Sequence, residues 1–227
     1  MKYLKVLISS IMAGCSIAFG ATFYLVLASQ GIFWLKVLGS FLFGIGLFTI
    51  IHFDFWLYTG KVGYIFENKP NYLLKLLISF IGNLIGVIGI SFLIKQTYVI
   101  NDNIISFCQN LVSIKDHERW FEVSILSFLC GMMIYLAVEG HKRASYPLAK
   151  VIFAFIPISL FIICGFEHVI ANACYYTYAG SLNWHEILWF IYMGLGNALG
   201  SLAFYGMEKL IKLFSKKKKL FKYTLLK

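Results

Sequence analysis

Three polar side chains capable of proton or hydrogen-bond chemistry lie close together in the stretch GFEHVIANA, residues 165–173. Glu167 can accept a proton, His168 can gain or lose one near neutral pH, and Asn172 offers an amide with both donors and acceptors. The flanking residues are apolar enough to lie within a membrane. Ionisable groups at membrane depth are costly and commonly mark a path for ions or protons.

The composition of the 227-residue chain is that of an integral membrane protein. It is 60% hydrophobic and only 13% charged, whereas soluble domains average about 25% charged residues. Apolar runs long enough to cross about 30 Å of hydrocarbon predict an all-α protein with six transmembrane helices. We place them at residues 6–28, 31–57, 72–94, 120–140, 148–176 and 184–208. We expect one membrane domain over residues 1–227, with the first span retained and not cleaved as a signal peptide.

The basic residues are unevenly divided between the two sides of the predicted membrane. The formal net charge is +10, and with both termini cytoplasmic, all but four of the 20 Lys and Arg residues are cytoplasmic. This positive-inside pattern predicts a multi-pass membrane protein with cytoplasmic termini. The membrane in which we expect it is the bacterial inner (plasma) membrane. The basic tail, residues 209–227, is then expected to contact anionic lipid and not nucleic acid.

The chain contains two similar halves, residues 1–94 and 115–214. GNLIG at 82–86 matches GNALG at 196–200, and AGCSI at 13–17 loosely matches CGMMI at 130–134. The second and fifth spans each carry an interruption, at LYTGK (57–61) and GFEH (165–168). Three spans per half predict an inverted-topology repeat with its pathway near the membrane midplane, beside the two broken helices.

Polar groups near the interruptions can be structural or functional. Asn83 and Asn197 can cap the broken backbone or contact a permeant species, and the sequence does not choose between these roles. We expect Glu167 to bond freed backbone amides or a neighbouring subunit.

Two other classes of function fit less well. A membrane enzyme could use Glu167 and His168 as acid and base, but no nucleophile–base pair, phosphate-binding loop or metal-ligand spacing accompanies them. The five cysteines show no CxxC pattern, so we expect no metal or other cofactor. A purely scaffolding membrane protein would not need polar groups at two matching breaks.

Several motifs then resemble one known family. KVIFAFIPISLFIICGFEHVIANA (150–173) is similar to the fifth-helix signature of the formate/nitrite transporter family. Four further stretches of this chain resemble the family's motifs of the second, third, fourth and sixth helices, in that order. They are GIGLFTIIHFDFWLYTGK (44–61), GNLIGVI (82–88), LCGMMIYLAV (129–138) and LGNALG (195–200). The resemblance implies an aquaporin-like homopentamer with one pore per subunit, which passes small monovalent anions such as formate, nitrite or hydrosulfide.

The resemblance also implies roles for single residues. His168 corresponds to the central pore histidine, Thr59 faces it from the break in the second helix, and Lys115 corresponds to an outer-vestibule lysine. Asn172 and Asn197 correspond to the buried asparagines of the family. The remaining correspondences are an outer apolar constriction of Phe43, Leu47 and Phe161, an inner one of Leu57, Tyr58 and Ile134, the inner-vestibule candidate Lys5, and Lys150, which is either a second candidate or a membrane anchor.

These groups suggest how an anion would pass. A bare anion in hydrocarbon costs nominally tens of kcal/mol, and Lys115 could concentrate anions but not carry them past an apolar constriction. A weak acid that takes up a proton loses most of this cost, because desolvation raises its pKa. The sequence therefore predicts proton-linked passage of a small weak-acid anion, with His168 and Thr59 at the gate.

The chain departs from the family pattern mainly around the break in the second helix. Gly131 replaces the asparagine after Leu-Cys, Trp56 replaces a glutamate, Asp54 replaces a glycine, and Tyr58 and Lys61 replace a phenylalanine and an asparagine. These differences leave the anion open, so a divergent member selective for hydrosulfide or another anion is the alternative. The sequence selects neither a transport direction nor a channel over a proton symporter.

Overall fold

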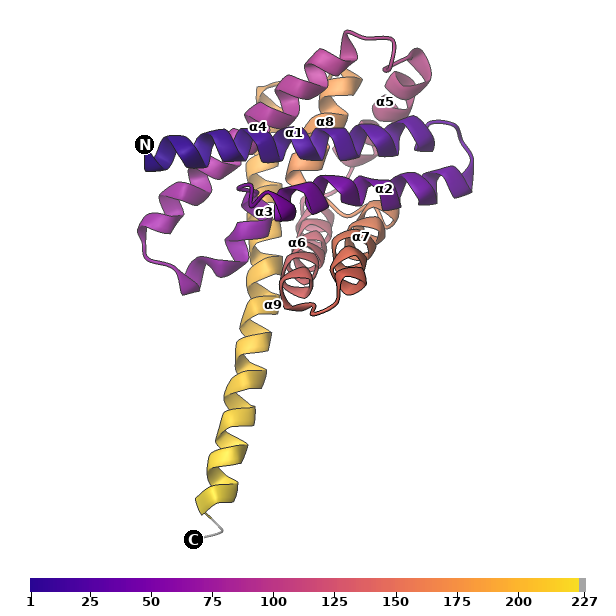
Figure 1. Cartoon of the computed structure of the whole chain (residues 1–227). Coiled ribbons are helices and arrows are strands. Elements are labelled where there is room, and N and C mark those ends of the chain that lie inside the picture. Colours follow the sequence, from indigo (N-terminus) through magenta and orange to yellow (C-terminus); the bar gives the residue numbers. More distant parts are fainter. Residues whose placement is uncertain (225–227) are drawn as a thin grey trace.

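The computed structural model describes residues 1–224, and side chains as far as Ser215. Every regular element in this part of the chain is helical (Figure 1). The elements are α1 (Lys2–Ala28), α2 (Phe33–His52), α3 (Tyr58–Lys61), the 3₁₀ helix η1 (Val62–Glu67), α4 (Asn71–Lys95), α5 (Asp102–Asp116), α6 (Trp120–Arg143), α7 (Pro147–Ile163), α8 (Val169–Ala179) and α9 (Trp184–Thr224).

Five helices are long and apolar enough to cross a membrane: α1, α2, α4, α6 and residues 184–215 of α9. The predicted span 148–176 corresponds to the shorter apolar helix α7, a non-helical stretch and most of α8. The predicted span 31–57 corresponds to α2 and a second non-helical stretch. We call residues 53–57 the first connector and residues 164–168 the second connector.

The interruption of the second span lies earlier than the sequence predicts. Residues 58–61 of LYTGK form the helical turn α3, and the non-helical residues are 53–57. Gly60 is helical, and the left-handed residue is Asp54 with φ of +51°. The interruption at GFEH is close to its predicted place, because Gly165 supplies a φ of +71°.

Helix α5 is an element that hydropathy does not predict. Its start is capped by Asn101, whose side chain accepts a hydrogen bond from the Ile104 N–H at 3.1 Å. Ile104, Cys108 and Val112 follow at a spacing of four residues and are buried, and α5 packs against α8. Polar residues on its other face keep its hydropathy too low for a span, although the face toward α8 is apolar.

The long helices pack side by side in an open series, and α8 packs against α4, α5, α1 and α9. In order, α4 packs on α1, α1 on α2, α2 on α7, α7 on α6 and α6 on α9. An apolar groove of about 960 Å³, lined by residues of α3, η1, α4 and α9, lies at the open side. All 11 residues of α8 are buried, which explains why this helix is apolar on every side.

Two helix pairs approach each other at glycines. A Cβ on Gly14 of α1 would lie 2.2 Å from the carbonyl oxygen of Asn83 in α4, and one on Gly131 of α6 would lie 2.0 Å from that of Asn197 in α9. A larger residue cannot be accommodated against this backbone, so small residues allow the close contact. The contact explains why glycine, and not the family asparagine, is compatible with position 131 in this chain.

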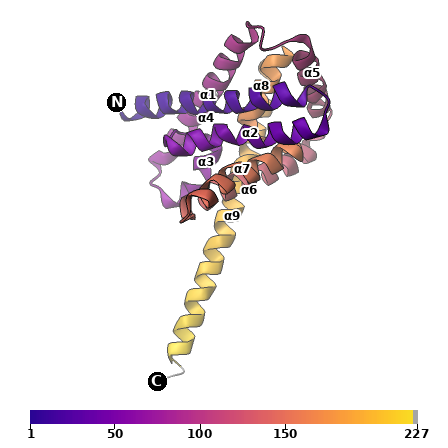
Figure 2. The same ribbon diagram turned by 45° about the vertical axis from the view of Figure 1, so that its right-hand side comes forward.

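The end of α9 leaves the bundle. In both views its later turns project beyond the other helices toward the C-terminus (Figures 1 and 2). The sequence places the end of the sixth span at residue 208, whereas the helix continues to Thr224. The lipid contact predicted for the tail concerns side chains mostly beyond Ser215, outside those that the structure describes.

Candidate pore site at the two helix connectors

The two connectors have matching backbone hydrogen bonds. In the first, Phe53 N–H donates to Thr49 O at 3.0 Å and Phe55 N–H to Ile50 O at 2.9 Å. In the second, Cys164 N–H donates to Leu160 O at 3.0 Å and Phe166 N–H to Phe161 O at 2.9 Å. Asp54 therefore occupies the place of Gly165 in the same type of turn.

Two buried asparagines hold the connectors from neighbouring helices. The Asn83 amide donates to the carbonyls of Ser10 at 2.7 Å and Trp56 at 2.8 Å, and its oxygen accepts from Tyr58 N–H at 2.8 Å. The Asn83 side chain therefore satisfies two backbone groups, the Trp56 carbonyl and the Tyr58 N–H, that the interruption leaves without helical partners.

Asn197 repeats this arrangement at the second connector. Its amide donates to the carbonyls of Ser127 at 2.8 Å and Glu167 at 2.7 Å, and its oxygen accepts from Val169 N–H at 3.1 Å. All three of these bonds go to backbone, so the geometry corresponds to the capping role that the sequence left open. Asn197 is fully buried.

The connectors bring Thr59 and His168 together. Thr59 Oγ1 lies 3.0 Å from His168 Nε2, and each residue is 1% exposed. His168 caps α8, with its Nδ1 accepting a hydrogen bond from the Ala171 N–H at 3.2 Å. Because Nδ1 is an acceptor, the neutral ring carries its proton on Nε2 and donates it to Thr59. The residues are 109 positions apart in sequence, and only the fold brings them together.

Glu167 lies beside His168 in sequence but in a different environment. Its fully buried carboxylate is bonded by the Lys115 ammonium and by the Asn172 amide. The Asn172 amide also lies 3.2 Å from Met193 Sδ. The carboxylate thus contacts side chains and not the backbone amides expected from the sequence. Lys115 is only 9% exposed and is held in this buried ion pair.

The apolar constriction residues do not all lie together. Phe43 and Phe161 pack edge to face with ring centroids 6.1 Å apart, and Phe161 lies 5.5 Å from the His168 ring. Tyr58 points elsewhere, with its ring against Phe80 and its hydroxyl donating to Gly194 O at 3.1 Å. Phe43, Leu47, Phe161, Leu57 and Ile134 are buried.

A cavity of about 510 Å³ lies next to the first connector. Leu47 and Leu57 line it, together with Gly60 of the Thr59 turn. Its charged lining residues are Asp54, Lys61, Glu67 and Lys142. We call it the Lys61 cavity. It brings Leu47, assigned from the sequence to the outer constriction, to the same space as Leu57 of the inner one.

Neither vestibule candidate from the N-terminal or fifth helix lines this cavity. Lys5 and Lys150 are exposed, and Lys150 contributes its backbone carbonyl to the ring nitrogen Nδ1 of His141, 3.0 Å away. Within the residues that the structure describes, no group of three or more His, Cys, Asp or Glu side chains is arranged to hold a metal ion.

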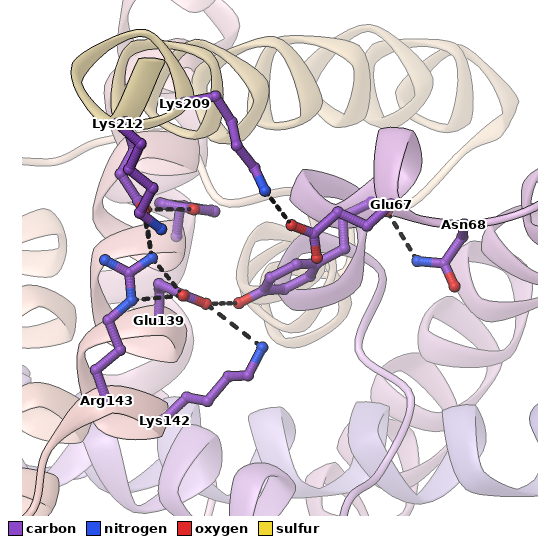
Figure 3. Close-up of polar contacts among 10 residues, drawn as sticks. Glu67, Asn68, Glu139, Lys142, Arg143, Lys209 and Lys212 are labelled. Atoms are coloured by element: carbon purple, nitrogen blue, oxygen red, sulfur yellow. Dashed lines mark hydrogen bonds and ion pairs between the residues drawn. The ribbon is translucent and has the colours of Figure 1, made fainter. Parts of the chain in front are cut away.

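A charge cluster joins α6, η1 and α9 (Figure 3). Glu139 accepts from Tyr64 Oη at 2.6 Å and from the Arg143 Nε at 2.6 Å, and Arg143 also bonds Glu208 of α9. Lys209 donates to Glu67 at 2.8 Å. These bonds attach η1, which directly follows the Thr59 turn, to α6 and α9.

Sequence reasoning missed two charged residues near the site. Asp54 was noted only as a departure, yet its carboxylate bonds Lys61 at 2.8 Å. Glu118 lies between α5 and α6, and one of its carboxylate oxygens is buried without a hydrogen-bond partner. The signal for Asp54 was present, because acids and asparagine tolerate left-handed turns better than most residues.

Comparison with solved structures gives the fold. A pentameric formate channel with formate bound superposes with a TM-score of 0.80 over 94% of this chain and 98% of that chain, at 23% identity. A second structure, described as an FNT family ion channel, gives a TM-score of 0.80 over 92% of this chain and 90% of that one, at 20% identity. At these identities the likeness shows the fold alone.

Three curated relatives are formate channels. FocA of Haemophilus influenzae is 28% identical over 181 residues, which are 72% of this chain and 62% of that protein. FocB of Escherichia coli is 27% identical over 182 residues, which are 74% of this chain and 64% of FocB. BtFdhC of Bacillus thuringiensis is 31% identical over 96 residues, 40% of this chain. The matches with FocA and FocB span somewhat less than two thirds of those proteins.

The sequence model described as formate/nitrite transporter matches residues 1–211. That range contains both connectors, both asparagines and the Thr59–His168 pair. The chain belongs to the formate/nitrite transporter family.

Proposed function

We propose that this chain forms a channel for small monovalent weak-acid anions, with one pore in each subunit of a homopentamer. The observation that carries the proposal is the hydrogen bond between Thr59 and His168, which joins α3, directly after the first connector, to the second connector at a buried point. Membership of the family and the three formate channels among its relatives favour formate as the anion.

The proposed pathway lies between two inverted repeats. The first repeat comprises α1, α2, α3 and α4, and the second comprises α6, α7, α8 and α9. Matching turns, matching asparagine contacts and the glycines Gly14 and Gly131 support this assignment. On this assignment α2–α3 and α7–α8 are the broken second and fifth helices, and the connectors meet near the membrane midplane.

His168 is the proposed hydrogen-bond donor to the passing anion. Its Nδ1 is engaged by the backbone, so Nε2–H is the group that can move from Thr59 to an anion oxygen. The Thr59 hydroxyl can reorient to donate or accept, because it has one proton and two lone pairs. The N-terminus of α8 adds positive partial charge beside His168.

Charge neutralisation is the second part of the proposed mechanism. Lys115 is already paired with Glu167, so it supplies little net charge to an anion in the apolar region around Phe43 and Phe161. Uptake of a proton by the anion removes the cost of burying its charge. We therefore propose that anion and proton move together through the constriction, in a bacterial inner membrane with both termini cytoplasmic.

The structure supports a membrane enzyme that uses Glu167 and His168 less well than it supports a channel. Glu167 is bonded by Lys115 and Asn172 and cannot serve as an acid beside His168 without leaving both partners. Nitrite and hydrosulfide remain the alternative substrates, because both are small monovalent weak-acid anions. Trp56, Asp54, Tyr58 and Lys61, where the chain departs from the family, all lie on the side of the first connector.

Reconstitution tests the proposal. Purified protein in liposomes with a trapped pH dye is exposed to a gradient of formate, nitrite or hydrosulfide, and internal pH and anion content are followed together. We expect at least one anion to enter with a proton, faster than in protein-free liposomes. Entry of none of the three would contradict the channel, and entry without a pH change would contradict proton linkage.

A further inference from the structure

Among the charged residues that the structure describes, one ion pair has both of its members in the lining of the Lys61 cavity. Lys61 Nζ lies 2.8 Å from Asp54 Oδ1. The other charged lining residues, Glu67 and Lys142, bond partners outside the lining, namely Lys209 at 2.8 Å and Glu139 at 3.9 Å (Figure 3). Lys61 is therefore balanced only by a side chain within the cavity.

Asp54 is held loosely compared with Lys61. Its side chain is 84% exposed, whereas that of Lys61 is 29% exposed. Exposed ion pairs contribute little to stability, since water competes for both charges. The Asp54 carboxylate can therefore leave Lys61 at small cost.

Lys61 has a second contact that keeps it in place when Asp54 leaves. Its Nζ lies 5.6 Å from the centroid of the Trp56 ring, within the range of a cation–π interaction. Trp56 occupies the position in the first connector that Glu167 occupies in the second, because the two turns have matching backbone bonds. A carboxylate at this position would neutralise a neighbouring lysine, as Glu167 does for Lys115, whereas an aromatic ring positions the lysine and leaves its charge available.

The cavity lies where a permeant anion must pass if the proposed function holds. It is lined by Leu57 and by Gly60, the neighbours of Tyr58 and Thr59 in the turn that faces His168. We propose that Lys61 is an anion-binding residue at the end of the pore next to the first connector, and that Asp54 is a built-in competitor for it. The ligand class is a small monovalent anion, for which the Asp54 carboxylate is a chemical equivalent of formate.

Competition has a defined consequence for transport. Removing the Asp54 charge frees Lys61 for the substrate, so half-saturation is reached at a lower anion concentration. An exposed pair supports an effect of about two- to fivefold. The same substitution has no effect once Lys61 is absent, because Asp54 then has no site to block.

The test measures formate uptake into liposomes against formate concentration for four variants and the wild type. Asp54→Asn removes the charge and keeps a residue that tolerates the left-handed turn. We expect it to lower the half-saturating concentration about threefold, Lys61→Gln to raise it, and Asp54→Asn with Lys61→Gln to match Lys61→Gln alone. Melting temperatures in detergent establish that each variant is folded.

Glu67→Gln is the matched control. It removes the same charge from the same cavity lining, but its partner Lys209 lies outside the lining. We expect it to shift half-saturation less than Asp54→Asn. Equal shifts, or an Asp54→Asn effect that persists without Lys61, would overturn the competition. The inference rests on the proposed function: absence of anion flux in the wild type overturns both, whereas wild-type flux that Asp54→Asn leaves unchanged overturns the inference alone.

Discussion

The first and second connectors share a backbone and differ in what surrounds them. Each is a left-handed turn held by an asparagine from the following helix of its repeat, Asn83 or Asn197. The second connector buries its charge, since Glu167 is 0% exposed and bonded to Lys115. The first exposes its charge, since Asp54 is 84% exposed and bonded to Lys61.

This difference indicates that the backbone conformation of each connector and the burial of its charged side chain have separate determinants. The asparagine contacts and the close glycines set the turn, whatever side chains the turn carries. The side chains then decide whether a lysine is neutralised in the interior, as Lys115 is, or remains near a cavity, as Lys61 does. The four predictions below test this separation in order of expected size.

The asparagines should give the largest effects. Asn197→Leu leaves the Val169 N–H and the Ser127 and Glu167 carbonyls without these partners, at roughly 1–3 kcal/mol for each buried group. We expect loss of folded protein, measured by size-exclusion chromatography and melting in detergent. Asn83→Leu should be equally damaging, and the exposed Asn103→Leu should be harmless.

A chain that tolerates Asn83→Leu but not Asn197→Leu would contradict the equivalence of the two connectors. In that case only the second connector would depend on its asparagine, and the first connector would be an ordinary loop.

The buried ion pair should come next. Lys115→Met leaves Glu167 charged and buried with only Asn172 as a partner, which costs roughly 3–5 kcal/mol. Adding Glu167→Gln removes the uncompensated charge, so the double variant should recover much of the lost melting temperature. Single and double variants that melt alike would show that the pair does not stabilise the second connector.

The exposed pair should affect stability much less. Asp54→Asn and Lys61→Gln each break a bond between side chains that are 84% and 29% exposed, so we expect a change of less than about 1 kcal/mol. Melting of both variants beside Lys115→Met gives the contrast between connectors directly. A loss as large as that of Lys115→Met would mean that the first connector depends on its charges as much as the second.

The smallest effect should come from Glu118, next to the buried pair. Burial, with the negative charge of Glu167, raises the pKa of Glu118 from 4.5 to about 7, while Lys115 opposes the shift. The folded chain therefore keeps a proton that the unfolded chain releases between these values, so stability falls as pH rises from about 4.5 to about 7. Because Glu118 is only partly buried, solvent screens these charges, and we expect less than about 1 kcal/mol.

Glu118→Gln should flatten this part of the melting profile, measured in detergent between pH 4.5 and pH 8. An unchanged profile would mean that Glu118 does not feel the charge at the second connector.

Much of the fold follows from the sequence because hydropathy and glycine spacing report helix length and close packing. The GFEH break was predictable, since Gly165 and three polar residues interrupt an apolar run. The first break was placed late, because Asp54 adopts the left-handed turn without a glycine. Helix α5 was missed because only its face toward α8 is apolar.

The site was predictable in part. The resemblance paired Thr59 with His168, and the structure places them 3.0 Å apart. It could not show that Glu167 bonds Lys115 and Asn172, or that Tyr58 turns away toward Gly194. Such contacts join residues distant in sequence, and neither motif spacing nor periodicity reports them.

One measurement tests the proposed pore most directly: the initial rate of formate uptake into liposomes by the wild type, His168→Phe and His52→Phe. His52 directly precedes the first connector, but it is exposed, stacks on Phe48 and takes no part in the Thr59–His168 hydrogen bond, so it is a matched histidine outside that contact. We expect the wild type and His52→Phe to carry formate at similar rates, and folded His168→Phe to fall to the rate of protein-free liposomes. Uptake by His168→Phe at the wild-type rate would contradict a pore that passes between His168 and Thr59.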